Sequence, residues 1–306
     1  MIQISKEDIK KWPVIKQMIT LLQSITFDTL QGISLYDLIK HYFIGLIKDA
    51  FTYRASAIAF SFFMALFPFA LFILNLIPFI PLENFQEDFL EFVAQSVPPN
   101  TYDAIATILK DIMSNSYKGL LSSGFLLSVF LMSNGINALL DGFEMSSNIS
   151  KKRGYFRQYG VAIGLSLVIA FLLLLTVATI VIVEIILQQI KLQDYVSNNI
   201  SILEWSRYGF VVLMILTITS LIYKFGTKET RNIHFFNHGS IMTTILFLLS
   251  SYVFGIYVEK FARYNELYGS IGTLLVMMFY VWINCILLLL GFELNAFIYK
   301  LKQKNN

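Results

Sequence analysis

The stretch "YGSIGTLLVMMFYVWINCILLLLGFELNAFIYK", residues 268–300, decides the fold because it is long and apolar enough to cross a lipid bilayer. Twelve Leu, Ile, Val or Phe residues lie between Leu274 and Phe292. At about −0.3 to −0.6 kcal/mol each, they contribute on the order of 4–7 kcal/mol to membrane insertion, which outweighs the cost of one neutral amide such as Asn284. We therefore predict a transmembrane helix over residues 271–297.

The composition extends this conclusion to the rest of the chain. Hydrophobic residues make up 56% of the 306 residues and charged residues 14%, against about 45–50% and about 25% in soluble domains. Five further stretches have the length and apolar character of a span: 55–80, 119–140, 159–187, 208–225 and 240–257. We expect an all-α polytopic membrane protein in which residues 53–300 form a membrane domain of six transmembrane helices.

The distribution of positive charge predicts the orientation. Seventeen of the 23 Lys and Arg residues lie before the first span, between the second and third, between the fourth and fifth, or after the sixth. Loops rich in Lys and Arg stay on the cytoplasmic side of a membrane. Both termini, including the tail 301–306, should therefore face the cytoplasm.

Two regions outside the spans have helical patterns of their own. Within a cytoplasmic N-terminal region, 1–52, apolar residues gather on one helical face of 37–51, which predicts an interfacial amphipathic helix. The connection 81–118 carries two apolar stripes separated by Pro98-Pro99, which predicts an external helical hairpin between the first and second spans.

Polar side chains within the spans are the candidate functional residues. Such groups usually face the bundle interior, where they mark a transport site or simply hold helices together at about 0.6 kcal/mol per contact. Pro68 is expected to break the first span near its middle, as in transporter sites. The candidate intramembrane site comprises Asn75, Asn134, Asn137, Glu184, Asn284 and Asn295.

The last span should have two different polar faces. A period of 3.6 residues places Asn284, Gly291 and Asn295 on nearly one face, where the glycine lets a helix or a ligand approach closely. Glu293 points roughly the other way and lies at the same depth as Arg54, which opens the first span. We expect these two charges to pair because each is costly to bury alone. The alternative is that Glu293 reaches interfacial water.

Enzyme chemistry finds little support in the sequence. The single cysteine, Cys285, excludes a disulfide framework and a cysteine-based zinc site. His234 and His238 have a metal-compatible spacing, but no third ligand is evident. No phosphate-binding loop or nucleophile elbow is present. The net charge of +3 is too small to indicate a nucleic-acid partner. We therefore predict no catalysis, no metal and no cofactor.

Three segments resemble the signature segments of the YihY/BrkB family: "YRASAIAFSFFMALFPF" (53–69), "FARYNELYGSIGTLLVMMFYVW" (261–282) and "LLLGFELNAF" (288–297). The resemblance implies a bacterial inner-membrane protein with six spans and both ends in the cytoplasm. It also singles out a close-approach turn formed by Tyr268, Gly269, Ser270 and Gly272, with Gly291 further along. The family was formerly labelled ribonuclease BN, but the sequence of this chain shows no metal-binding cluster of a nuclease.

Two functions remain open at the level of sequence. The polar groups, the expected break at Pro68 and the resemblance favour a transporter-like protein that moves an amphiphile or envelope lipid. The alternative is a non-transporting scaffold for envelope integrity that recruits an envelope protein partner through the external hairpin. Membrane lipids are expected partners in both cases.

Overall fold

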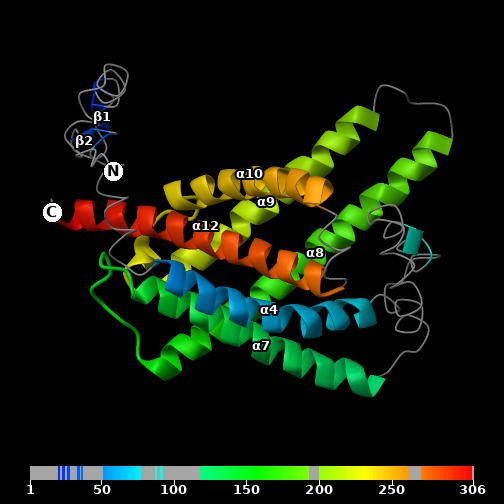
Figure 1. The fold of residues 1–306 in the computed structure, drawn as a ribbon, viewed down its shortest axis with the longest axis horizontal. Helices are drawn as coiled ribbons and strands as arrows, with labels where there is room; N and C mark the ends of the chain where they lie inside the picture. Colours follow the sequence, from blue (N-terminus) through cyan, green and yellow to red (C-terminus); the bar gives the residue numbers. More distant parts are fainter. Residues whose placement is uncertain are drawn as a thin grey trace, which may run out of the picture.

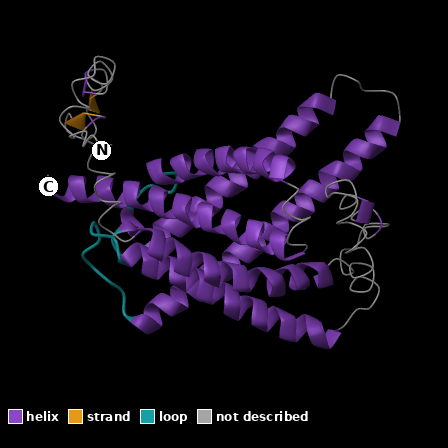
Figure 2. Ribbon diagram, viewed as in Figure 1, coloured by secondary structure: helices purple, strands orange, loops and turns teal. Residues whose placement is uncertain are grey.

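The computed structural model describes residues 51–76, 118–192, 200–261 and 270–304, together with residues 20, 23–24, 26–27, 33–34, 36, 87 and 90–91. Six long helices form this structure (Figure 1): α4 (Phe51–Leu76), α7 (Lys118–Glu144), α8 (Tyr155–Leu192), α9 (Ile200–Gly226), α10 (His238–Phe261) and α12 (Ser270–Lys304). A 3-10 turn, η3 (Thr230–Asn232), precedes α10. Two short antiparallel strands, β1 (Thr26–Phe27) and β2 (Ile33–Ser34), pair near the N-terminus (Figure 2).

Each predicted span corresponds to one of the six helices, and five of them are long and apolar enough to cross a membrane: α7, α8, α9, α10 and α12. The corresponding apolar part of α4 is the shorter segment Phe51–Leu66. The structure is thus that of a helical membrane protein, while the count of six spans stays a prediction. Several helices run beyond the predicted spans, because a helix satisfies its own backbone hydrogen bonds in water as well as in lipid.

The six helices form a closed ring. Each helix packs against the next in chain order, from α4 to α7, α8, α9, α10 and α12, and α12 returns to pack against α4. Small and branched residues fill the contact between α4, α7 and α12, including Ala55, Ile58, Leu139 and Leu289, all buried. Chain-distant helices, α4 and α12, are therefore direct neighbours.

The outer surface of the ring is apolar. Large side chains such as Phe60, Phe130, Phe171, Leu249 and Tyr252 are exposed along different helices. Soluble proteins rarely expose contiguous apolar surface of this extent. The exposed side chains therefore fit a surface that faces lipid.

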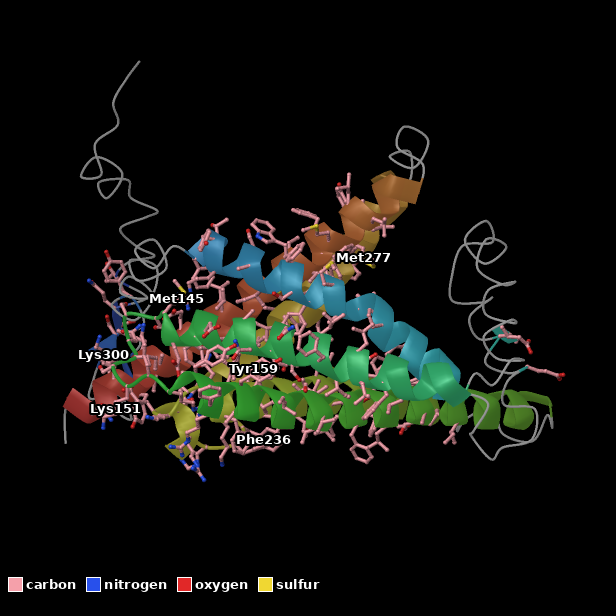
Figure 3. All side chains as sticks on the ribbon, turned by 90° about the horizontal axis from the view of Figure 1, so that it is seen from below. Met145, Lys151, Tyr159, Phe236, Met277 and Lys300 are labelled. Atoms are coloured by element: carbon pink, nitrogen blue, oxygen red, sulfur yellow. The ribbon has the colours of Figure 1, made fainter. Side chains whose placement is uncertain are left out.

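One end of the ring collects the positive charge. The start of α4, the connection 145–154, the connection 227–237 and the end of α12 all lie at the end drawn on the left in Figure 1. Figure 3 shows Lys151 and Lys300 there. We call it the basic end, defined by Lys151, Lys152, Arg153, Arg157, Lys228, Arg231 and Lys300.

One expectation from the sequence is wrong, and two others are not tested. The helix α4 is continuous through Pro68, so the first span is not broken there, and Ser128 of α7 donates a hydrogen bond to the Pro68 carbonyl oxygen at 2.7 Å. The first helix begins at Phe51, the last residue of the range predicted for the interfacial helix. The rest of that helix, 37–50, lies outside the described residues, as does most of the hairpin 81–118.

Candidate functional site

A partly open cavity of about 410 Å³ lies between the helices and is lined by side chains from all six of them. Each helix contributes through the face that packs toward its neighbours. Representative lining residues, one per helix in chain order, are Ala65, Ile136, Ile169, Ile222, Phe247 and Asn284. The volume falls within the roughly 300–1,000 Å³ that is typical of ligand-binding pockets.

The lining of this cavity is almost wholly apolar, and none of the described residues that line it is charged. Its polar side chains already bond within the protein. Asn284 donates to the Tyr280 carbonyl oxygen at 2.8 Å, and the Tyr280 hydroxyl lies 2.6 Å from the Ser251 hydroxyl oxygen. Thr219 donates to the Ile215 carbonyl oxygen at 2.9 Å. Such a cavity suits an uncharged hydrocarbon chain better than an ion or a headgroup.

The cavity ends at a densely packed layer on the side of the basic end. Phe143 of α7, Tyr223 of α9 and Phe292 of α12 are fully buried and form what we call the aromatic layer. The rings of Phe143 and Phe292 stack with centroids 3.9 Å apart. Leu140 and Leu289, also fully buried, complete the layer.

Beyond the aromatic layer, the predicted contact between Arg54 and Glu293 is present. Both guanidinium Nη atoms of Arg54 lie 3.0 Å from Glu293 Oε1. The other carboxylate oxygen accepts hydrogen bonds from Ser146 at 2.6 Å and from Asn148 at 3.4 Å. Arg54 is 2% exposed and Glu293 4%, so Glu293 does not simply reach interfacial water.

The opposite face of α12 packs against α10. Asn295 accepts a hydrogen bond from the Gly239 backbone N–H at 2.8 Å and donates to Asn237 Oδ1 at 2.5 Å. It therefore completes the N-terminal cap of α10, in which Asn237 and Ser240 bond reciprocally. At Gly291, a Cβ atom would lie 2.8 Å from the Gly239 carbonyl oxygen. The close approach is thus a helix contact between α10 and α12.

Asn134 and Asn137 lie elsewhere, on the contact between α7 and α8. The Tyr159 hydroxyl donates to Asn134 Oδ1 at 3.0 Å. Asn137 donates to Asp141 at 3.1 Å, and Gln158 donates to the same carboxylate at 2.5 Å. This polar seam ties α7 to α8 near the basic end and does not reach the lining of the cavity.

The six polar candidates therefore do not form one cluster. Of the four candidates whose side chains the structure describes, only Asn284 lines the cavity. Asn75 and Glu184 lie on α4 and α8, but the structure does not describe their side chains. Of the proposed turn, Tyr268 and Gly269 lie outside the described residues, Ser270 begins α12, and Gly272 is buried.

Sequence reasoning missed the groups that organise the connections at the basic end. Glu229 accepts hydrogen bonds from the backbone N–H groups of Ser150 and Lys151, at 3.1 and 2.8 Å. Arg153 donates to the Phe225 and Gly226 carbonyl oxygens at the C-terminus of α9, where a cation is favoured by the helix dipole. Burial lowers the pKa of Arg153 from its ordinary value, and nearby Glu144 opposes that change.

A signal for this arrangement was present in the sequence, since polar and charged residues fill the short connection 145–154. Their partners could not be read from it, because they come from α9, α12 and the connection after α9. Among the described residues, no group of three or more His, Cys, Asp or Glu side chains is placed to hold a metal ion.

Residues 43–306 match the family described as "Virulence factor BrkB". The Bacillus subtilis protein YfkH, whose name describes it as ribonuclease-like, is 28% identical over 255 residues, which cover 82% of this chain and 90% of YfkH. Proteins named UPF0761 membrane protein are also similar. That of Coxiella burnetii strain RSA 493 is 21% identical and covers 80% of this chain and 86% of its own length. The protein of Haemophilus influenzae strain 86-028NP is 24% identical, and the match covers 78% of this chain and 87% of that protein.

No solved structure matches the chain. The match nevertheless covers all six long helices, the cavity lined by them and the Arg54–Glu293 pair. Relatives over the same region carry the name of membrane protein, in keeping with five apolar helices of spanning length. The chain belongs to the BrkB family of membrane proteins.

Proposed function

We propose that this chain is a transporter-like protein of the bacterial inner membrane that moves an amphiphile, such as an envelope lipid, with both termini in the cytoplasm. The observation that carries the proposal is the apolar cavity of about 410 Å³ to which all six helices contribute. An uncharged, apolar lining would hold the hydrocarbon chain of the cargo. The headgroup would have to lie outside the cavity, because no lining side chain that the structure describes is charged.

Access to the cavity supports movement rather than permanent storage. Phe62, Leu66, Ile218, Val281 and Asn284 line it, and all five are only half-buried. A lipid chain could therefore enter from the surroundings without unfolding a helix. The polar partners of Asn284 and Tyr280 are internal, so a chain sliding past them would not leave a buried polar group unpaired.

The proposal is tested by filling the cavity. Ala65→Phe places a ring in the cavity, while Ala57→Phe, on the same helix at an exposed position, makes the same change on the outer surface. In liposomes that contain a phospholipid with a fluorescent headgroup, an impermeant quencher added outside reports movement between leaflets. We expect transfer by the native chain, loss of roughly tenfold or more with Ala65→Phe, equivalent to about 1.4 kcal/mol, and native rates with Ala57→Phe.

Equal rates for the two variants would contradict a role for the cavity. If the native chain moves no lipid but retains one envelope protein through purification, the scaffold function replaces the transporter. Cleavage of RNA by the same preparation, abolished together with the fold, would instead support the ribonuclease-like description given to YfkH.

A further inference from the structure

A packed wall separates the cavity from the basic end. On α12, Cys285 and Leu288 line the cavity, and Glu293 lies eight residues after Cys285, about 12 Å along the helix. Leu289 and Phe292, between them, are fully buried. The aromatic layer and the Arg54–Glu293 pair therefore lie between the cavity and the basic end on this side of α12.

The ion pair joins three separate parts of the chain at this closure. Arg54 belongs to the first turn of α4, Glu293 to the last third of α12, and Ser146 and Asn148 to the connection after α7. Lys300 adds a hydrogen bond from α12 to the carbonyl oxygen of Ser147 at 3.0 Å. Separation of Arg54 from Glu293 would remove the ionic contact between α4 and α12, while Ser146 and Lys300 would still hold the connection to α12.

A buried ion pair next to water is suited to a reversible closure. Burying two charges costs hydration, and their mutual attraction and hydrogen bonds offset that cost only when the geometry is good. When the two groups separate toward the aqueous end, each regains hydration. The closed and open states can therefore lie close in free energy. An apolar contact alone would not regain favourable hydration when it separates.

We propose that the Arg54–Glu293 pair is a gate that closes the central cavity on the side of the basic end. In the present structure the gate is shut, with both partners buried and the aromatic layer packed beneath them. When the pair separates, α4 and α12 part and the cavity opens to that side. The proposal serves the transport function but depends only on the cavity, so it can hold or fail whatever the cargo is.

The chain contains its own reporter for this gate. Cys285 is the single cysteine of the sequence, is buried, and lines the cavity. In inverted membrane vesicles, where the basic end should face the medium, an impermeant maleimide can reach Cys285 only through an open gate. We expect slow labelling of the native chain and labelling about tenfold faster or more in Glu293→Gln, because the neutral amide cannot replace the charged contact with Arg54.

Two further variants keep the test decisive. Glu144→Gln removes another buried carboxylate at the same end, one that bonds the backbone of Arg153 rather than α4, and it should label at the native rate. Arg54→Lys keeps the charge but loses the two-pronged guanidinium contact, so it should fold even if Glu293→Gln does not and should label at an intermediate rate. The side facing the reagent is checked with Ser150→Cys in a Cys285→Ala background.

The gate is overturned if folded Glu293→Gln, or folded Arg54→Lys, labels no faster than the native chain. It is equally overturned if Glu144→Gln accelerates labelling as much, since the effect would then be general loosening of the basic end. This test measures thiol modification and not lipid transfer. The gate can therefore be confirmed or overturned whether or not the chain transfers lipid.

Discussion

Glu293 is surrounded by hydrogen-bond donors in a part of the bundle where water is excluded. The Arg54 guanidinium, the Ser146 hydroxyl and the Asn148 amide all donate to its two oxygens. Arg54 in turn lies over the ring of Phe51, 5.5 Å from its centroid. A buried carboxylate held in this way stabilises the fold only while its partners remain, since removal of one leaves an uncompensated charge.

Replacing both members of the pair should therefore cost less than the sum of the two single replacements. We expect Arg54→Ala or Glu293→Ala to lower the free energy of unfolding by about 3–5 kcal/mol, and the double variant to lose less than the sum of the two. Denaturant unfolding of the purified protein in micelles measures all three. Lys300→Ala, at an exposed position, is the control and should cost about 0–1 kcal/mol. Strictly additive losses would show that the two residues do not act as a pair.

The ion pair was predictable from the sequence, and its surroundings were not. Arg54 opens the first span and Glu293 closes the last, so antiparallel passage through the membrane places both at one depth. Ser146 and Asn148 stand in a connection whose path depends on how α7 and α8 pack. No periodicity describes such a segment, and its contacts with Glu293 could not be anticipated.

Among the helices, α12 shows how one element can serve two neighbours. The face with Trp282 and Glu293 meets α4, where the indole N–H donates to Ser56 Oγ at 3.1 Å. The face with Gly291 and Asn295 meets α9 and α10, where Tyr223 donates to the Leu288 carbonyl oxygen at 2.9 Å. The helical period separated these two faces correctly, because a 3.6-residue repeat holds wherever a helix is regular.

Gly291 should be intolerant of the smallest enlargement. A methyl group there would overlap the Thr243 side chain and the Gly239 backbone, so Gly291→Ala should destabilise the protein by roughly 1–3 kcal/mol, although alanine favours the helix itself by about 1 kcal/mol. Thermal unfolding in micelles gives the comparison. Gly164→Ala on α8, where the added carbon would meet open space, should be neutral or slightly stabilising. A tolerated Gly291→Ala would mean that α10 and α12 can move apart freely.

Other patterns in single helices were misleading. Gly160 and Gly164 have the spacing of a close helix contact, yet an added Cβ at either one would meet no neighbouring helix within 4 Å. Pro68 was expected to break α4, which is instead continuous. The glycine spacing and the proline are local features of the sequence. Whether they produce a helix contact or a break depends on how the neighbouring helices pack, which is set by the whole ring.

For the whole molecule, the sequence predicted the helices but not the cavity. Six apolar stretches and their order were readable, because each must satisfy its backbone within itself. The cavity depends on how side chains from all six helices are placed relative to one another. The sequence of a single segment does not contain that information. The closed ring, in which α12 returns to α4, likewise follows from packing and not from the order of the segments.

The orientation of the ring can be tested without knowing its cargo. In a Cys285→Ala background, Ser150→Cys places a thiol in the connection between α7 and α8, where the native side chain is exposed and only its backbone N–H is used, by Glu229. Asn100→Cys places one in the segment that joins the other ends of α4 and α7. An impermeant maleimide applied to spheroplasts should modify Asn100→Cys and leave Ser150→Cys unmodified, because Lys and Arg concentrate at the basic end and predict that it faces the cytoplasm. As a control, the membrane is then disrupted. The Ser150→Cys thiol should become reactive, which would show that the bilayer and not the fold had shielded it. Modification of Ser150→Cys in sealed spheroplasts would place the basic end outside and would reverse the side to which the proposed gate opens.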